Sequence, residues 1–359
     1  MDKHPNLIVH TTDPINAEPP LDALRENFIT PQDLFYVRNH GNIPEIDVKN
    51  YRLHVNGMVE RPLELSLDTL RNNFSNQKIM ATVQCAGNRR NQLIEVAPIP
   101  SEVPWREGAI GNTVWTGIPL KEVLAAAGVK AGAEHVEFVG GDDVFRHGEN
   151  VGFGGSIPIE KAMNHEVLLA YEMNGKPLEP IHGFPLRTIV PGYIGARSVK
   201  WLRRITLQEE PSENYFQSIA YRLFPAHVNA ENVDSHPGTQ LSELSVNCVI
   251  TSPHQGSTIS GKKIKVCGYA MSGGHRISRV EVSIDNGNTW ITAVITQADQ
   301  QWAWSFWEVS IELKMGEYEV IARAFDSASN TQPEDAKHVW NFKGYMNNAW
   351  HRVKIKMSN

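Results

Sequence analysis

The most regular pattern of hydrophobic and polar positions lies in the C-terminal third of the chain. Residues 279–285 alternate strictly, with Val280, Val282 and Ile284 on one side and polar side chains on the other. This period of two predicts a half-buried β-strand, and the Asn286-Gly287 pair after it predicts a tight turn. Further short strands are expected to start at residue 289 and to cover residues 245–251, 263–270, 302–309, 318–326 and 338–342.

The first two thirds of the chain show a more varied pattern. Short β-rich runs at 51–55 and 135–139 alternate with short helical segments. A serine at position 66 is a suitable N-cap for a helix over 67–73. Residues 119–127 are expected to form a helix, because proline stands at the start and glycine just after the end. Another helix is expected near residue 159, and the first 40 residues, rich in proline, are expected to form an extended arm.

Together these patterns predict a chain of the α+β class with two domains. Residues 1–234 are expected to form a mixed α+β domain whose long loops carry the functional side chains. Residues 235–359 are expected to form an all-β domain, since about seven short strands at this spacing are typical of an immunoglobulin-like sandwich. The regular alternation of strands and helices that marks a doubly wound sheet is missing from the sequence.

Composition and charge exclude several classes of protein. The chain has 359 residues, 41% hydrophobic and 21% charged, close to the average for globular proteins. Its net charge of -6 argues against a general attraction to nucleic acid or anionic membranes. No apolar run approaches the roughly 18 residues that a membrane helix needs. The polar start shows no leader, so we expect a cytoplasmic protein, or a periplasmic one if a leader has been removed.

The cysteines point to one chemically distinctive segment. An odd, low number, Cys85, Cys248 and Cys267, argues against a disulfide framework. Cys85 is followed by Ala-Gly-Asn-Arg-Arg at 86–90. We expect the arginines and backbone N–H groups to lower the pKa of this thiol, and the thiolate is the form that binds soft metals. A lone cysteine is more often a small buried hydrophobe, so the neighbouring residues carry this prediction.

Three other segments, 35–40, 181–187 and 191–201, combine basic side chains with histidine or glycine turns. Such sets suit a large anionic ligand, because arginine pairs bidentately with phosphate and backbone amides add further donors. A single arginine is usually solvated. Three such clusters in a net acidic chain favour an anion-binding site.

These segments together resemble the sulfite oxidase family of molybdenum enzymes, in the haem-free form typical of plants. The Cys-Ala-Gly-Asn-Arg-Arg run at 85–90 is similar to the family's cysteine-ligand motif. Four other runs match its pattern: Arg-Asn-His, His-Gly-Phe-Pro, Gly-Ala-Arg and Val-Lys-Trp, at 38–40, 182–185, 195–197 and 199–201. The C-terminal region resembles the family's immunoglobulin-like dimerisation domain, and the likeness begins near residue 28.

The resemblance implies a molybdenum–molybdopterin cofactor with Cys85 as the single protein ligand to the metal. It implies a substrate pocket lined by Arg38, Arg90, Trp105 and Tyr221. It also implies a homodimer, formed through the C-terminal domain, that oxidises sulfite and passes two electrons to an external acceptor, dioxygen or a cytochrome c. The residues implied to hold the pterin and its phosphate are Tyr36, Val37, Arg38, Asn39, His40, Asp142, His182, Arg187, Ser198, Val199 and Lys200.

One position departs from the family and leaves a second reading open. Lys343 stands where sulfite oxidases of this type usually carry arginine; lysine keeps the charge but loses the planar fork. The molybdenum domain of an assimilatory nitrate reductase, which lacks that arginine, is therefore the alternative. Tyr221 and His351 favour sulfite oxidation, because these nitrate reductases usually have asparagine and an aromatic residue there.

Other classes explain the sequence less well. A methionine sulfoxide reductase with the same cofactor fold would lack an all-β domain at 235–359. An adhesion module would give no reason for the Cys85 segment and the basic clusters. No CxxCH motif and no segment resembling cytochrome b5 is present, so we expect no haem in this chain.

Overall fold

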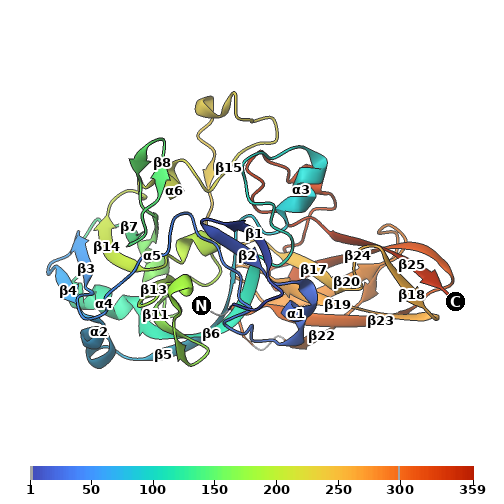
Figure 1. Ribbon diagram of the computed structural model, residues 1–359, viewed down its shortest axis with the longest axis horizontal. Coiled ribbons are helices and arrows are strands. Elements are labelled where there is room, and N and C mark those ends of the chain that lie inside the picture. Colours follow the sequence, from blue (N-terminus) through green and yellow to red (C-terminus); the bar gives the residue numbers. More distant parts are fainter. Residues whose placement is uncertain (1–2, 298–299) are drawn as a thin grey trace.

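The computed structural model describes residues 3–297 and 300–359, which form two regions arranged end to end (Figure 1). The first region contains mixed sheets and short helices, and the second, coloured orange and red, is built from strands. The predicted α+β class with a β-rich C-terminal part is confirmed. Within the described residues, no helix has the length and apolar character needed to cross a membrane.

The N-terminal arm is more structured than an extended segment. It forms an antiparallel hairpin and a short helix: β1 (Ile8–Thr12), β2 (Ile15–Glu18) and α1 (Leu21–Glu26). Glu18 is fully buried and accepts hydrogen bonds from the backbone N–H groups of Arg106 and Gly108, both at 2.8 Å. The arm is therefore attached to the first region by a buried carboxylate, which the proline-rich sequence did not reveal.

Two five-stranded sheets form the body of the first region. One sheet has the order β10-β7-β14-β3-β4, and only the β14–β3 pair is parallel. The other contains β12-β11-β6-β5, with β13 paired to β11. The strands are β3 (Leu53–Gly57), β4 (Leu63–Leu65), β5 (Gln77–Gln84), β6 (Ile110–Pro119), β7 (His135–Gly140), β10 (Gly154–Pro158), β11 (Leu168–Met173), β12 (Lys176–Pro177), β13 (Arg187–Ile189) and β14 (Leu202–Gln208).

Helices cover these sheets where the sequence predicted them. Helix α2 (Leu67–Asn73) begins at Ser66, whose hydroxyl accepts from the Thr69 N–H at 3.0 Å. Helix α4 (Leu120–Ala127) ends at Gly128, which adopts a positive φ of 73°. Both helices pack apolar side chains, among them Leu70 and Leu124, against the sheets in one core. Helix α5 (Ile159–Ala162) is a single turn.

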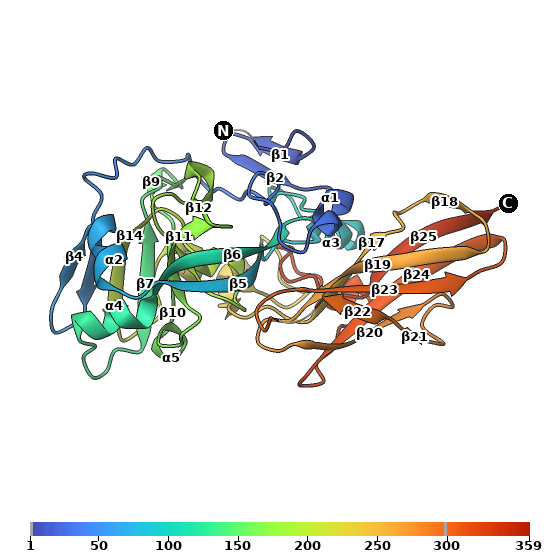
Figure 2. The same ribbon diagram turned by 90° about the horizontal axis from the view of Figure 1, so that it is seen from below.

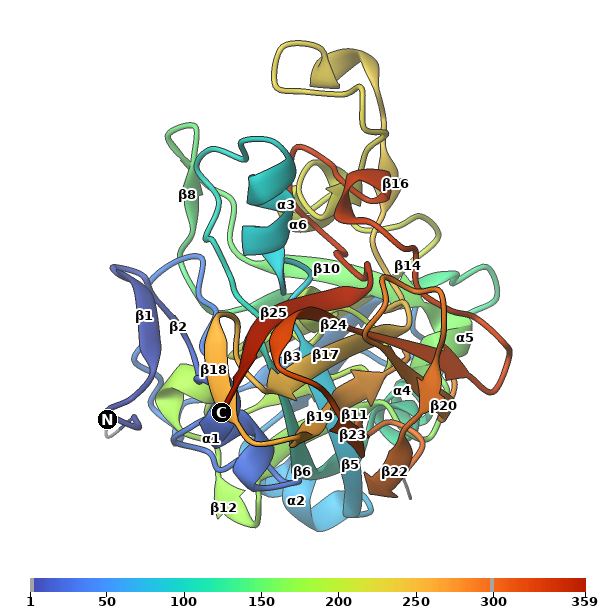
Figure 3. The same cartoon turned by 90° about the vertical axis from the view of Figure 1, so that its right-hand side faces the viewer.

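Shorter elements lie in the connecting loops of the first region. Figure 3 shows that the loop between β15 and β16 projects from the body of the molecule. The elements are α3 (Arg90–Val96), β8 (Phe145–Arg146), β9 (Glu149–Asn150), η1 (Pro180–His182), η2 (Gly195–Arg197), α6 (Tyr215–Ser218), β15 (Arg222–Leu223), η3 (Val233–Ser235) and β16 (Thr239–Gln240).

The second region consists of two sheets with a shared core. Their orders are β17-β19-β23-β22 and β18-β25-β24-β20-β21. Val280 and Val282 are fully buried, as the alternation predicted. The strands are β17 (Asn247–Ser252), β18 (Ser257–Ser260), β19 (Lys263–Met271), β20 (Ile277–Ser283), β21 (Ile291–Thr292), β22 (Val294–Gln297), β23 (Ser305–Glu312), β24 (Gly316–Asp326) and β25 (His351–Ser358).

The strand predicted at 338–342 is wrong. A short helix, η4 (Ala336–His338), and a turn occupy that position, and the last strand is β25. Asn341 is fully buried, and its side-chain amide bonds the backbone oxygens of Val339 and Tyr345 at 3.1 and 2.9 Å. The indole N–H of Trp340 donates to Ala97 at 3.2 Å. Side-chain bonds thus replace the ladder bonds that a strand would make.

A third hydrophobic core joins the two regions. Ile110, Phe216 and Tyr221 of the first region pack in one buried cluster with Trp304 and Tyr345. Figure 2 shows β5 and β6 reaching from the body of the first region toward the strands of the second. The second region therefore forms part of the wall behind the segments that carry the site.

Candidate active site

A cavity opens where several elements of the first region end, and it encloses about 670 Å³ of space, mouth included. Strand β5 ends one residue before Cys85, and β7 ends two residues before Asp142. Helix η1 ends at His182, β13 begins at Arg187, and η2 ends one residue before Ser198. The order of the strands brings these distant parts of the sequence to one place.

Most of the residues predicted for the site line this cavity. The lining side chains that the sequence had singled out are Tyr36, Arg38, Asn39, His40, Cys85, Asp142, His182, Arg187, Ser198, Lys200 and Tyr221. Five predicted residues lie outside the lining: Val37, Arg90, Trp105, Val199 and Lys343. The cavity thus unites the cysteine segment with all three basic clusters.

Cys85 is held by the backbone around it. Its N–H donates to Ala109 at 2.9 Å, and its Sγ accepts from the Gly87 N–H at 3.5 Å. Burial raises the pKa of the thiol, although Arg38, Arg90 and the Gly87 N–H act in the opposite direction. The expected lowering of this pKa is therefore wrong for the protein without a metal, because the desolvation of a buried thiolate outweighs its charged neighbours.

A chain of hydrogen bonds runs from Arg38 through His40 to Tyr221. The guanidinium Nη2 of Arg38 lies 3.1 Å from Nδ1 of His40, and Nε2 of His40 lies 2.8 Å from Oη of Tyr221. Burial, followed by the charge of Arg38, lowers the pKa of His40 well below its usual value, so the ring is neutral at pH 7. Since arginine only donates, Nδ1 accepts and Nε2 carries the proton. His40 therefore donates to Tyr221, whose own O–H remains available to the cavity.

Tyr221 is fixed in an uncommon conformation. Its φ is 51°, in the left-handed region that residues with a side chain seldom adopt. Its ring stacks on Tyr345 with the centroids 5.3 Å apart. Burial raises the pKa of Tyr221 to about 12, so the hydroxyl stays protonated. Such a constrained residue at a cavity wall is typical of a functional position.

The lining also contains Arg187, Lys200 and Asp142, which are basic or incompletely paired. Arg187 donates to the backbone oxygens of His182 and Ser198 at 2.9 and 3.0 Å. Lys200 donates to the side chain of Asn39, and burial lowers its pKa well below the usual value. Asp142 is buried, and its Oδ1 makes no hydrogen bond among the described residues. Burial raises the pKa of this carboxyl to about 6.

Of the five predicted residues outside the lining, three are uncharged and buried, and the other two are charged. Val37 and Val199 are buried, and their backbone groups bond Ala17 and Thr188, so they position their neighbours. Trp105 is fully buried beside the cavity in the cluster that contains Cys85, and its indole N–H makes no hydrogen bond within the described parts of the chain.

Arg90 and Lys343 are the two charged residues, and their charges meet at one carboxylate. Arg90 is buried and donates to the backbone oxygens of Lys343 and Gly344, both at 3.1 Å. Glu102 lies 3.8 Å from Nη2 of Arg90 and 3.6 Å from Nζ of Lys343. Arg90 therefore ties the segment at 343–344 to the cysteine segment.

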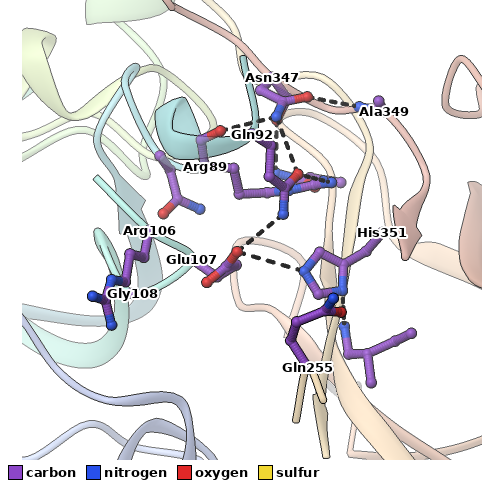
Figure 4. A network of polar contacts seen from close by, with 12 residues as sticks. Arg89, Gln92, Arg106, Glu107, Gly108, Gln255, Asn347, Ala349 and His351 are labelled. Carbon is purple, nitrogen blue, oxygen red and sulfur yellow. Dashed lines mark hydrogen bonds and ion pairs between the residues drawn. The ribbon is translucent and has the colours of Figure 1, made fainter. Parts of the chain in front are cut away.

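A second polar network lies where the segment after Cys85 meets the second region (Figure 4). Arg89 donates to Oε1 of Gln92 at 2.8 Å, and Gln92 donates to Glu107 at 3.0 Å. Glu107 faces Nε2 of His351 at 3.7 Å, and the side chain of Asn347 donates to the backbone oxygen of Arg89 at 2.9 Å. Sequence reasoning missed this network, because its partners lie up to 258 residues apart.

Glu107 is well compensated in this network. Burial alone would raise its pKa, but the N–H of His351 and the charge of Arg89 lower it to about 2. Arg89 also donates to Oδ1 of Asn247 at 2.6 Å, which extends the network into β17. Arg89, four positions after Cys85, is thus hydrogen-bonded to the second region.

Three aromatic residues of the lining had no assigned role: Phe35, Phe153 and Trp201. Phe35 and Trp201 lie within the segments 35–40 and 191–201, which the sequence had singled out for their basic side chains. Phe153 lies in a glycine-rich stretch with no such signal; its ring stacks on His40 at 5.2 Å.

Comparisons with known proteins find matches over both regions of the chain. Residues 40–216 match the family described as "Oxidoreductase molybdopterin binding domain", and residues 239–358 match "Mo-co oxidoreductase dimerisation domain". Mitochondrial sulfite oxidase of Homo sapiens is 42% identical over 99% of the chain and 67% of that relative. Sulfite oxidase of Arabidopsis thaliana is 41% identical over 99% of the chain and 95% of the relative.

Two further likenesses bear on the class of reaction. The NAD(P)H nitrate reductase of Hordeum vulgare is 40% identical over 99% of the chain, which spans 42% of that relative. The crystal structure of sulfane dehydrogenase SoxCD from Paracoccus pantotrophus is similar with a TM-score of 0.80, 29% identity, and coverage of 96% of this chain and 85% of that one.

The fold and the site define a molybdopterin-binding oxidoreductase. More specifically, the chain belongs to the sulfite oxidase family.

Proposed function

We propose that this protein oxidises sulfite to sulfate at a molybdenum–molybdopterin cofactor and passes two electrons to an external acceptor, dioxygen or a cytochrome c. One observation carries the proposal: Cys85 and Tyr221 line the same cavity as Arg38, Arg187 and Lys200. The relatives named sulfite oxidases, about 40% identical over nearly the whole chain, support it.

The groups in the cavity fit such a cofactor. The unpaired Oδ1 of Asp142 needs a hydrogen-bond donor, and a pterin ring offers N–H groups. Arg187 and Lys200 suit its phosphate, and a cysteine sulfur suits molybdenum as a soft ligand. Cys85 would be the metal ligand, and the residues from Tyr36 to His40, together with Asp142, His182, Arg187 and residues 198–200, would hold the pterin.

The protein's own groups then bind and orient the substrate. Arg38 adds positive charge beside Cys85 and attracts anionic sulfite. The protonated hydroxyl of Tyr221 would donate a hydrogen bond to a substrate oxygen, because His40 already donates to its Oη. Arg90, Trp105 and Lys343 would act from behind the lining.

The reaction takes one oxygen atom from water and turns sulfite into sulfate, two electrons and two protons. When bound, the molybdenum cofactor would supply the oxygen-atom transfer and accept the electron pair. Because Nε2 of the neutral, buried His40 donates to Oη of Tyr221, the hydroxyl proton of Tyr221 remains available to the substrate.

Nitrate reduction is the alternative, because relatives with that name are nearly as similar. The position of Tyr221 in the cavity favours sulfite, as does His351 in the junction network. The lysine at position 343, where sulfite oxidases usually carry arginine, does not decide between the two reactions. Its ammonium group pairs with Glu102 outside the cavity lining.

Further parts of the proposal concern organisation and location. We propose domains at 1–234 and 235–359, with an immunoglobulin-like second domain that forms a homodimer, since residues 239–358 match a family of dimerisation domains. We also propose a protein without haem in this chain, located in the cytoplasm, or in the periplasm if a leader has been removed.

A paired assay tests the function. Purified protein of known molybdenum content is given sulfite with ferricyanide as acceptor and, separately, nitrate with reduced viologen as donor. The proposal expects sulfite-dependent ferricyanide reduction in proportion to molybdenum. Nitrate reduction without sulfite oxidation would establish the alternative, and protein that acquires no molybdenum in a cofactor-producing host would contradict both.

A further inference from the structure

A half-buried lysine near the start of the chain contacts His182, a residue of the cavity lining. Nζ of Lys3 donates to the backbone oxygens of Gln32 and Phe35 at 2.7 and 3.0 Å, and it lies 2.9 Å from Nε2 of His182. His182 is 2% exposed and lines the cavity, whereas Lys3 is outside the lining. Neither the sequence motifs nor the proposed reaction assigns a role to Lys3.

The contact determines which nitrogen of His182 carries the proton. An ammonium group only donates, so the nitrogen 2.9 Å away must offer a lone pair. Burial, followed by the charges of Lys3 and Lys200, lowers the pKa of His182 well below its usual value, so the ring is neutral. A neutral ring that accepts at Nε2 carries its proton at Nδ1.

The proton at Nδ1 is available to a ligand. Nδ1 of His182 makes no hydrogen bond with residues 3–297 or 300–359. The opposite tautomer would let Nε2 donate to Gln32, 3.1 Å away, but it would place an N–H against the ammonium of Lys3. The same backbone oxygen already accepts from Lys3 at 2.7 Å, so it does not need His182.

We propose that Lys3 is a cofactor-positioning residue: it fixes His182 in the tautomer with Nδ1–H, so that His182 donates to an acceptor atom of the bound pterin cofactor. The inference rests on the proposed function, because it assumes that this cofactor occupies the cavity. It makes the N-terminal arm part of the cofactor site rather than a segment attached for stability.

The test measures cofactor retention rather than turnover. Holoenzyme is incubated at pH 7 and passed over a desalting column at intervals, and the pterin still bound is converted to its fluorescent oxidised form and quantified. Lys3→Met should release pterin about tenfold faster than the unchanged protein, the effect of losing one hydrogen bond made by a charged group. Lys3→Arg should largely restore retention, and Lys314→Met, at an exposed lysine of the second region, is the matched control.

A second arm separates positioning from simple stabilisation. Asparagine places an N–H near the position of Nδ1 and needs no partner at Nε2, so Lys3→Met should have no further effect in a His182→Asn background. Equal retention in Lys3→Met and the unchanged protein would overturn the inference, and so would additive effects in the double variant. If the unchanged protein holds no pterin, the proposed function itself fails, and the inference with it.

Discussion

The cavity and the domain junction both bury a carboxyl group close to basic residues, yet they treat it in opposite ways. At the junction, Glu107 meets Gln92, His351 and the charge of Arg89, and its pKa falls to about 2. In the cavity, Asp142 has an unpaired oxygen, and its pKa rises to about 6. At the junction, the buried carboxylate has its hydrogen-bond partners among the described residues of the chain. In the cavity, one oxygen of the buried carboxyl group has none there, and a bound ligand is expected to provide the donor.

This difference indicates which polar clusters are functional. Both regions are rich in arginine and buried amides, so residue types alone do not separate them. What separates them is whether each buried group finds its partner within the chain.

Cys85→Ser should abolish sulfite oxidation, a loss of more than about a thousandfold, because a hard hydroxyl replaces the soft metal ligand. The melting temperature of the metal-free protein should change little, since serine fits the same space. Turnover and thermal unfolding are measured on the same preparation. Sulfite oxidation near the rate of the unchanged protein would contradict the assignment of Cys85 as a metal ligand.

Arg89→Met should lower the free energy of unfolding by about 3–5 kcal/mol, because it leaves Gln92 and Asn247 without their common donor and removes the charge that stabilises the Glu107 carboxylate. Urea unfolding of the metal-free protein measures this. The matched control is Arg61→Met, at an exposed arginine of the first region. A loss below about 1 kcal/mol would show that the junction is not the stabilising network described above.

Tyr221→Phe should lower kcat/KM for sulfite about a hundredfold and leave molybdenum content unchanged, because it removes one donor aimed at the reacting group. Steady-state kinetics with ferricyanide, corrected for molybdenum content, measure the loss. An unchanged kcat/KM would place the hydroxyl outside the reaction, and a large loss of molybdenum would make Tyr221 a structural residue instead.

Neutralising the two carboxyl groups should change stability in opposite directions. The raised pKa of Asp142 means that its ionisation costs stability as the pH rises from 3.8 toward 6. The lowered pKa of Glu107 means that its ionisation contributes stability above 4.5, which is lost only as the pH falls toward 2.

At pH 7.5, Asp142→Asn should therefore stabilise the metal-free protein, and Glu107→Gln should destabilise it, each by on the order of 2 kcal/mol. Between pH 5 and pH 8, the gain for Asp142→Asn should grow, whereas the loss for Glu107→Gln should stay level. Thermal unfolding across this range measures both variants. Two shifts of the same sign would refute the contrast between the regions.

Lys343→Arg should have the smallest effect, a change in the KM for sulfite of about twofold or less. The ammonium of Lys343 pairs with Glu102 outside the cavity lining, and partly exposed pairs of this kind contribute little. Steady-state kinetics in sulfite measure it. A tenfold lower KM would place this side chain in the substrate pocket.

The sequence predicted the elements with strong local signals. The serine cap of α2, the proline and glycine that bound α4, and the buried Val280 and Val282 all depend on residues close in the chain. The hairpin and helix of the N-terminal arm and the turn at 338–342 escaped prediction, because contacts with distant residues help to determine them: Glu18 with Gly108, and Trp340 with Ala97.

The candidate site was predicted to a similar extent and for the same reason. Motifs identified the residues whose type carries the chemistry, such as Cys85, Arg187 and Tyr221. Motifs did not show that burial would raise the pKa of Cys85, or that Lys3 reaches His182. Both properties arise from packing between segments far apart in the sequence.

The most direct test of the central claim is X-ray absorption at the molybdenum edge, on the unchanged protein and on Cys85→Ser loaded with cofactor. If Cys85 binds the metal, molybdenum in the unchanged protein has one sulfur neighbour more than molybdenum in the variant. The same number of sulfur neighbours in both would contradict the claim that the cavity binds the metal through Cys85.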